Sequence, residues 1–232
     1  MGIAGTDHGL QEAFHGVGGV PIPSYFRKAL FSFYFKDEKI FFSSNVTSES
    51  KVKLHRNIVE RVKKVTPFLH QDKEPYLVMT EDRYYWVIDA YTLSDKFPAS
   101  IPASEDFLDG EQKFNYIRNS VKVVIDALDG DVDYYISDPT DAIIQAYSSA
   151  YPGLFKSLDE MPKDLRAHLR YPQDLYFLQM KVYAKYHQQS PELFYEQAET
   201  WQFAQVRDKT VLPYYQTMDF GNCDDQEEFV LI

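Results

Sequence analysis

The sequence is poor in cysteine, in positive charge and in long apolar runs, and each shortage excludes a class of protein. Its single cysteine, Cys223, cannot form an internal disulfide, whereas a secreted eukaryotic domain of this size often carries several. Lysine and arginine total 24 against 35 aspartates and glutamates; the resulting charge of −11 argues against nucleic acid as a partner and predicts repulsion from anionic lipid. No stretch approaches the roughly 20 apolar residues that cross a bilayer.

Motifs of common catalytic and cofactor sites are also missing. The sequence has no P-loop, no GxGxxG, no HExxH, no CxxC and no GxSxG. Asp129, Asp131 and Asp133 alternate like the start of a calcium-binding loop, but the rest of that loop, with its closing glutamate, is not there. We therefore expect no cofactor and no metal site.

Apolar and aromatic residues, by contrast, are abundant and arranged in alternating patterns. Hydrophobic residues make up 44% of the chain, and 18 tyrosines and 17 phenylalanines predict broad half-buried surfaces. Apolar residues alternate with polar ones on both sides of Asp129-Gly130, which predicts a β-hairpin with a tight turn. The same pattern predicts three hairpins in all: residues 76–94, residues 120–139, and residues 211–220 with 227–232.

Helical periodicity accounts for most of the remaining chain. Ser24 can cap a helix that runs to about residue 35, and Thr47 starts another that Pro67 ends. Pro172 starts the strongest one, residues 173–188, which should lie across the sheet. Shorter helical segments are expected within residues 37–44, 141–150, 158–170 and 191–197.

These elements predict an α+β fold, because the hairpins occur without an alternating βαβ rhythm. We expect an antiparallel sheet built from β-hairpins and covered by helices on one side. Residues 1–19, rich in glycine and polar side chains, are expected to be a flexible tail, and residues 20–232 a single domain.

Seven runs of residues stand out along the chain: RNIVERV at 56–62, TPFL at 66–69, YYWVIDAYT at 84–92, NYIRNSVK at 115–122, PGLF at 152–155, MPKDLRAHLRYP at 161–172 and EFVL at 228–231. In this order they resemble segments of one protein family, UPF0182. The resemblance implies that the chain is a fragment of the large soluble region of a bacterial multi-pass membrane protein. It would then lie on the extracytoplasmic side of the cell membrane, with the protein's own transmembrane region and other envelope proteins or polymers as partners. The family supplies no activity and no catalytic residues to carry over.

The first candidate site is a cluster of cationic and aromatic residues between two predicted helices. Arg166, His168, Arg170 and Tyr171 lie within six positions and could hold a carboxylate or a phosphate, with Arg118 and Asp174 joining them in the fold. The alternative is an ion-pair network that fixes the last long helix to the sheet.

The second candidate is a pair of acids, Asp89 and Asp126, which occupy equivalent places in two hairpins. On neighbouring strands they could share a proton or a cation. The alternative is that both are carboxylates near turns that accept backbone N–H bonds.

Together these features favour a non-enzymatic extracytoplasmic binding or scaffolding module. One competing class is an enzyme on a cell-envelope polymer, with Asp89 and Asp126 as acid and base; a cleft holding two acids roughly 5–10 Å apart would indicate it. The other is a small-anion sensor built on Arg166 and Arg170.

Overall fold

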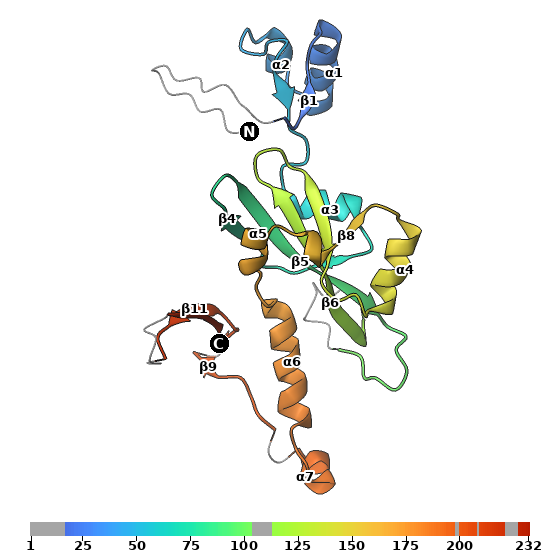
Figure 1. Cartoon of the computed structure of the whole chain (residues 1–232), viewed down its shortest axis with the longest axis vertical. Coiled ribbons are helices and arrows are strands. Elements are labelled where there is room, and N and C mark those ends of the chain that lie inside the picture. The colour runs from blue at the N-terminus through green and yellow to red at the C-terminus, as the bar shows by residue number, and fades with distance from the viewer. Residues whose placement is uncertain (1–16, 104–112, 198–199, 208, 221–226) are drawn as a thin grey trace.

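The computed structural model describes residues 17–103, 113–197, 200–207, 209–220 and 227–232, and a six-stranded sheet lies at its centre (Figure 1). The strand order is β3-β5-β6-β7-β8, and β4 also pairs with β5. The strands are β3 His70–Gln71, β4 Tyr76–Met79, β5 Tyr84–Ser94, β6 Tyr116–Asp126, β7 Val132–Ile136 and β8 Phe155–Ser157. All pairings are antiparallel except that of β7 with β8, which is parallel.

Two of the predicted hairpins form the middle of this sheet. Strands β4 and β5 pair antiparallel, as do β6 and β7. Gly130 follows the second turn with a φ of 81°, a conformation that glycine adopts without steric cost. The two hairpins join through β5 and β6, whose register shifts once, between Ala90 and Thr92.

Helices cover both faces of the sheet, where cover on one face was predicted; the α+β class itself is confirmed. Helix α3 (Ile58–Val65) and helix α4 (Ala142–Ala150) pack on one face through Val62 and Ile144. The short helix α5 (Lys163–Ala167), with the 3₁₀ turn η1 (Leu158–Glu160) before it, packs on the other. The reason lies in the central strands, where consecutive positions are apolar, so that both faces must be shielded from water.

The N-terminal elements differ from the prediction in one place. Helix α1 (Tyr25–Phe35) begins as expected, with the Ser24 hydroxyl accepting from the N–H of Arg27 at 3.4 Å, and α2 (Lys39–Phe42) follows. The helix expected from Thr47 is wrong: Asn57 caps α3 by accepting from two backbone N–H groups. The segment before Asn57 instead contributes strand β2, Lys51–Val52, which pairs with β1, Val20–Pro21.

Of the tail predicted for residues 1–19, only residues 17–19 lie within the described part. Gly18 contacts the second hairpin turn, where its N–H donates to the Asp129 carboxylate at 3.0 Å. A side chain on Gly18 would collide with the Asp129 backbone, since an added Cβ would lie 2.1 Å from its carbonyl oxygen.

The strongest predicted helix is present as α6 (Gln173–Tyr186) but does not lie across the sheet. It projects away from it (orange in Figure 1), and within it only Leu175 is buried. Apolar side chains occur around much of this helix, so no single stripe directs it onto the sheet. No helix in the described ranges is both long and apolar enough to span a bilayer.

The C-terminal region contains the third predicted hairpin. Strand β11 (Tyr215–Met218) pairs antiparallel with β12 (Glu228–Leu231), while residues 221–226 between them, which include Cys223, lie outside the described residues. Helix α7 is Pro191–Glu196, and a short pair of strands, β9 (Gln205–Val206) and β10 (Lys209–Thr210), precedes the hairpin.

Candidate functional site

A buried ion pair lies on the α5 face of the sheet, in the middle of its two longest strands. Asp89 of β5 stands directly opposite Lys122 of β6, and the two residues are 4% and 6% exposed. The Lys122 ammonium contacts the Asp89 carboxylate and donates to the backbone carbonyl of Arg170 at 2.9 Å. The Asn119 amide donates to the same carboxylate at 3.0 Å. Burial raises the pKa of Asp89, and the attraction of Lys122 opposes that rise. We call this ion pair with its two neighbours the polar junction.

Two further carboxylates adjoin the polar junction. Asp72 is buried and accepts the hydroxyl of Tyr91, which is itself fully buried. The backbone of Asp72 is held to β5, its N–H donating to the carbonyl of Asp89 at 2.8 Å. Asp174, in the first turn of α6, accepts from the N–H of Lys73 at 3.4 Å. Burial and the nearby negative charge of Asp72 raise the pKa of Asp174 to about 6.

Arg170, one of the predicted anion ligands, lies among aromatic rings. Its guanidinium carbon is 4.5 Å from the ring centre of Tyr76, 4.9 Å from that of Phe229 and 5.5 Å from that of Tyr215. These distances are typical of cation–π contacts. Its backbone N–H also donates to the Tyr76 hydroxyl at 3.1 Å. Arg170 therefore links strand β4 to the C-terminal hairpin.

The other members of the predicted anion cluster point to different partners. Arg166 pairs with Asp159 at 2.9 Å, and His168 places Nδ1 2.7 Å from the carbonyl oxygen of Asp164. The Tyr171 hydroxyl donates to the side-chain oxygen of Gln179 at 2.7 Å. The side chains of the cluster therefore do not converge on one point.

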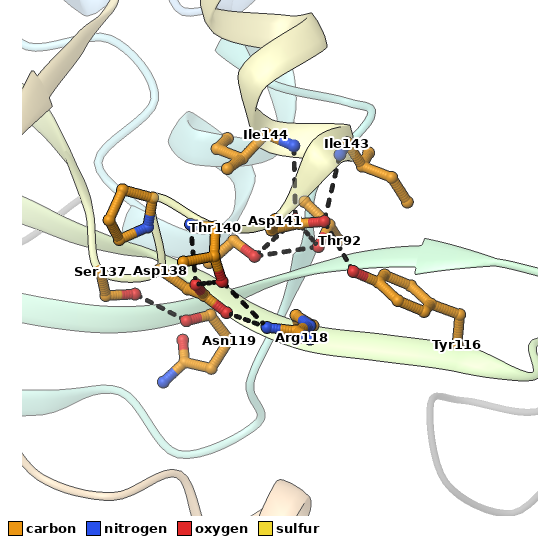
Figure 2. A network of polar contacts seen from close by, with 12 residues as sticks. Thr92, Tyr116, Arg118, Asn119, Ser137, Asp138, Thr140, Asp141, Ile143 and Ile144 are labelled. Carbon is orange, nitrogen blue, oxygen red and sulfur yellow. Dashed lines mark hydrogen bonds and ion pairs between the residues drawn. The ribbon is translucent and has the colours of Figure 1, made fainter.

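Arg118 lies in a separate network at the start of α4, shown in Figure 2. It pairs with Asp138 at 2.6 Å. Beside it, the buried carboxylate of Asp141 accepts the hydroxyls of Thr92 and Ser120, each at 2.6 Å, and that of Tyr116 at 2.7 Å. Burial alone would raise the pKa of Asp141, but these donors lower it below its usual value.

Asp141 also caps α4, since it accepts the backbone N–H groups of Ile143 and Ile144. With so many donors the carboxylate is satisfied inside the fold. This network joins α4 to β5 and β6.

The predicted acid pair does not form, although β5 and β6 are neighbours. Asp126 stands opposite Tyr85, four positions along β5 from Asp89. At about 3.4 Å per residue, the two acids are roughly 14 Å apart along the strands. Asp126 pairs with Arg83 at 2.7 Å and accepts turn N–H groups, as its alternative reading expected; Asp89 belongs to the polar junction instead.

The carboxylates of the second hairpin also separate. Asp129 accepts from Gly18, whereas Asp133 pairs with Lys156 at 2.7 Å. Within the described residues, no group of three or more His, Cys, Asp or Glu side chains is arranged to hold a metal ion.

Lys122 is the residue that sequence reasoning missed. The signal was present, because Lys122 lies within the otherwise apolar run Val121–Ile125, and a buried ammonium needs a partner. Without the register of β5 against β6, Asp89 could not be identified as that partner.

Comparison with known proteins agrees with the resemblance of the seven runs. The model of a family described as "Uncharacterised protein family (UPF0182)" matches residues 4–232. The chain belongs to this family. It is 48% identical to a UPF0182 protein of Methylococcus capsulatus over 99% of this chain and 27% of that protein. It is 49% identical to one from Nitrosococcus oceani, over 90% of this chain and 25% of the relative.

This UPF0182 chain therefore spans about a quarter of the length of the curated relatives it matches. A third relative, from Syntrophobacter fumaroxidans, is 45% identical over 87% of this chain and 23% of its own length. No solved structure matches the chain.

Proposed function

We propose that this UPF0182 chain is a non-enzymatic binding and scaffolding module, carried on the extracytoplasmic side of a longer bacterial membrane protein. The observation that supports it is that the charged groups of the polar junction are paired with each other inside the fold. The two acids that the enzyme alternative requires are roughly 14 Å apart along the strands, and each is paired with a cation of the chain. A general acid or base must instead reach a substrate proton.

Apolar side chains on the outer elements supply the binding surfaces. Large apolar residues remain exposed on α1, on α6 and on the C-terminal hairpin, for example Phe33, Val182 and Phe229. Contiguous exposed apolar surface marks sites of interaction. The matched relatives are about four times longer than this chain, so their remaining polypeptide supplies one set of candidate partners.

In such a module the polar junction would hold the segment before α6 against the sheet. Lys122 donates to the Arg170 carbonyl, and the Arg170 side chain contacts the C-terminal hairpin. The junction therefore fixes the connection from which α6 projects. In this role Asp89 and Lys122 determine where the binding surfaces lie, without contacting a ligand themselves.

A paired screen tests the binding role. Peptidoglycan fragments, divalent cations and inorganic anions are added to the chain, and both thermal unfolding and turnover are followed. A ligand of a binding module should raise the melting temperature without being turned over, because a ligand at 100 times its Kd adds about 2.7 kcal/mol to the free energy of unfolding. Hydrolysis that Asp89→Asn abolishes would favour the enzyme, and a phosphate shift that Arg170→Gln abolishes would favour the anion sensor.

A second experiment tests the location. The full-length relative from Methylococcus capsulatus is expressed with a tag in the matching region, and spheroplasts are treated with protease. The tag should be lost while a cytoplasmic marker protein survives. Retention of the tag until the cells are lysed would place this region in the cytoplasm and contradict the proposal.

A further inference from the structure

The positive charge of this chain is concentrated at its N-terminal end. Residues 20–65, which comprise β1, α1, α2, β2 and α3, contain ten lysines and arginines and only four acids, whereas the whole chain has a formal charge of −11. We call this part the basic lobe. The charge of the whole chain predicts repulsion from anionic lipid, but a surface interacts mainly with charges within a Debye length, ~10 Å. The basic lobe therefore presents a local charge opposite to the average.

Helix α1 carries an exposed apolar face within the basic lobe. Phe26, Leu30, Phe33 and Tyr34 follow the spacing i, i+4, i+7 and i+8, which places them on one side of the helix. Phe26 is 78% exposed and Phe33 is 84% exposed. These four residues are called the aromatic stripe. A cavity of about 820 Å³ adjoins it, lined by Leu30, Phe31, Phe33, Tyr34, Lys36 and Leu54.

Four cationic residues lie near the aromatic stripe. Arg27 and Lys28 belong to α1, and Lys36 and Lys39 follow at its end and in α2, with Asp37 and Glu38 between them. Arg27 donates to the Pro21 carbonyl and Lys28 contacts the Val46 carbonyl, which are neutral partners that leave both positive charges uncompensated. An apolar face bordered by lysine and arginine is the pattern of helices that lie in a bilayer interface.

The position of the basic lobe suits a flat partner. In Figure 1, α1 and α2 form one end of the long axis of the molecule, and α6 and α7 lie toward the other. Helix α3 packs on the sheet, so the part of the basic lobe at this end is residues 20–52, which carry five lysines and arginines and three acids. This end can meet a plane ahead of the acidic remainder of the chain. Phenylalanine and leucine are moreover typical of the lipid-facing side of interfacial helices, and tyrosine gathers at membrane–water interfaces.

We propose that the aromatic stripe seats this chain on an anionic lipid bilayer, with Phe26, Leu30 and Phe33 in the interfacial layer and the surrounding cations facing the headgroups. The inference rests on the proposed function, since it names one partner of the binding module. It needs only the chain and lipid, so its failure is distinct from a failure of the spheroplast experiment, which concerns location alone.

Vesicle co-sedimentation tests the inference. The 232-residue chain is mixed with vesicles of phosphatidylcholine, with or without phosphatidylglycerol. Binding should require phosphatidylglycerol and should weaken as salt is raised. The double variant Phe26→Ser/Phe33→Ser should bind at least tenfold more weakly, with an unchanged melting temperature because both side chains are exposed. Tyr195→Ser is the matched control, since Tyr195 of α7 is an aromatic residue that is 90% exposed.

A fluorescence measurement reports insertion directly. Phe33→Trp should add emission that shifts to the blue with phosphatidylglycerol vesicles, whereas Tyr195→Trp should not respond. Equal binding to neutral vesicles, no binding, or no blue shift at position 33 would overturn the inference. So would a self-association, seen by sedimentation, that Phe33→Ser abolishes, because the aromatic stripe would then be covered by a second copy of the chain.

Discussion

The central sheet and the outer elements contain similar residues but bury them to different extents. In β5 and β6, neighbouring residues such as Val87 and Ile88 are fully buried, because helices cover both faces. In α1 and α6, residues of the same kind stay in water: Phe33 is 84% exposed and Val182 is 50% exposed. We call α1, α2, α6, α7 and the β11–β12 hairpin the outer elements.

This difference separates what the chain stabilises by itself from what it offers to partners. The sheet also encloses its charges, as in the polar junction, where Lys122 and Asp89 neutralise each other. The outer elements have apolar surface and few such contacts. These elements can therefore still gain about 25 cal/mol of free energy for each Å² of apolar area that a partner buries on docking.

The largest effect should come from breaking the polar junction. Lys122→Met leaves the Asp89 carboxylate buried without its cation, which typically costs about 3–5 kcal/mol in free energy of unfolding. Urea unfolding at pH 7 measures this. The loss should shrink at lower pH, since Asp89 can then take up a proton before it is buried.

Two comparisons keep this result interpretable. Lys156→Met breaks the pair with Asp133, in which both side chains are more than 40% exposed, and should cost below about 1 kcal/mol. The double variant Asp89→Leu/Lys122→Met should recover much of the lost stability, because no isolated charge remains. Equal costs for Lys122→Met and Lys156→Met would mean that the ion pair of the polar junction is as exposed to solvent as the surface pair of Lys156 with Asp133.

The sheet was predictable from sequence because its hairpins are local. Alternating residues on either side of Asp129-Gly130 determine both the turn and the register of β6 with β7. The register of β5 with β6 depends instead on a connection of more than twenty residues, from Ser94 to Tyr116, which constrains it weakly. For that reason the partner of Lys122 was missed, and the sequence left open whether Asp89 and Asp126 meet or lie apart.

The outer elements were predicted as elements but not in their placement. Helix α6 was correct in extent and wrong in direction, since apolar residues around the helix do not specify a single buried side. The cluster at residues 166–171 was misleading for a related reason. Helix α5 ends at Ala167, and the φ of −99° and ψ of 5° of the next residue, His168, are not helical, so the side chains on either side of it diverge.

A pair of identical substitutions sharpens the comparison of the sheet with the outer elements. Val123→Thr puts a hydroxyl into the core at a fully buried position, and we expect a loss of about 1–3 kcal/mol. Val182→Thr makes the same change on α6 in solvent and should alter stability by less than about 0.5 kcal/mol. Urea midpoints at constant m-value measure both. A similar loss at position 182 would mean that α6 is packed in solution.

The smallest effect is expected at Asp174, where the sheet meets α6. Burial beside Asp72 raises its pKa from 3.8 to about 6, so the folded state favours the protonated form. The stability that this form contributes is present below pH 4 and is lost as the pH rises through 6. The full shift corresponds to about 3 kcal/mol. Because the side chain is only half-buried, solvent screening reduces the expected effect to about 1 kcal/mol.

Asp174→Asn should therefore raise the free energy of unfolding by about 1 kcal/mol at pH 7.5 and leave it unchanged at pH 4. The neutral amide can still accept the N–H of Lys73, and it no longer repels Asp72. Asp164→Asn, in the first turn of α5 and exposed, is the matched control and should gain nothing at either pH. A gain that is the same at both pH values would show that Asp174 is ionised in the folded state throughout, and that α6 leaves the sheet through a hydrated junction.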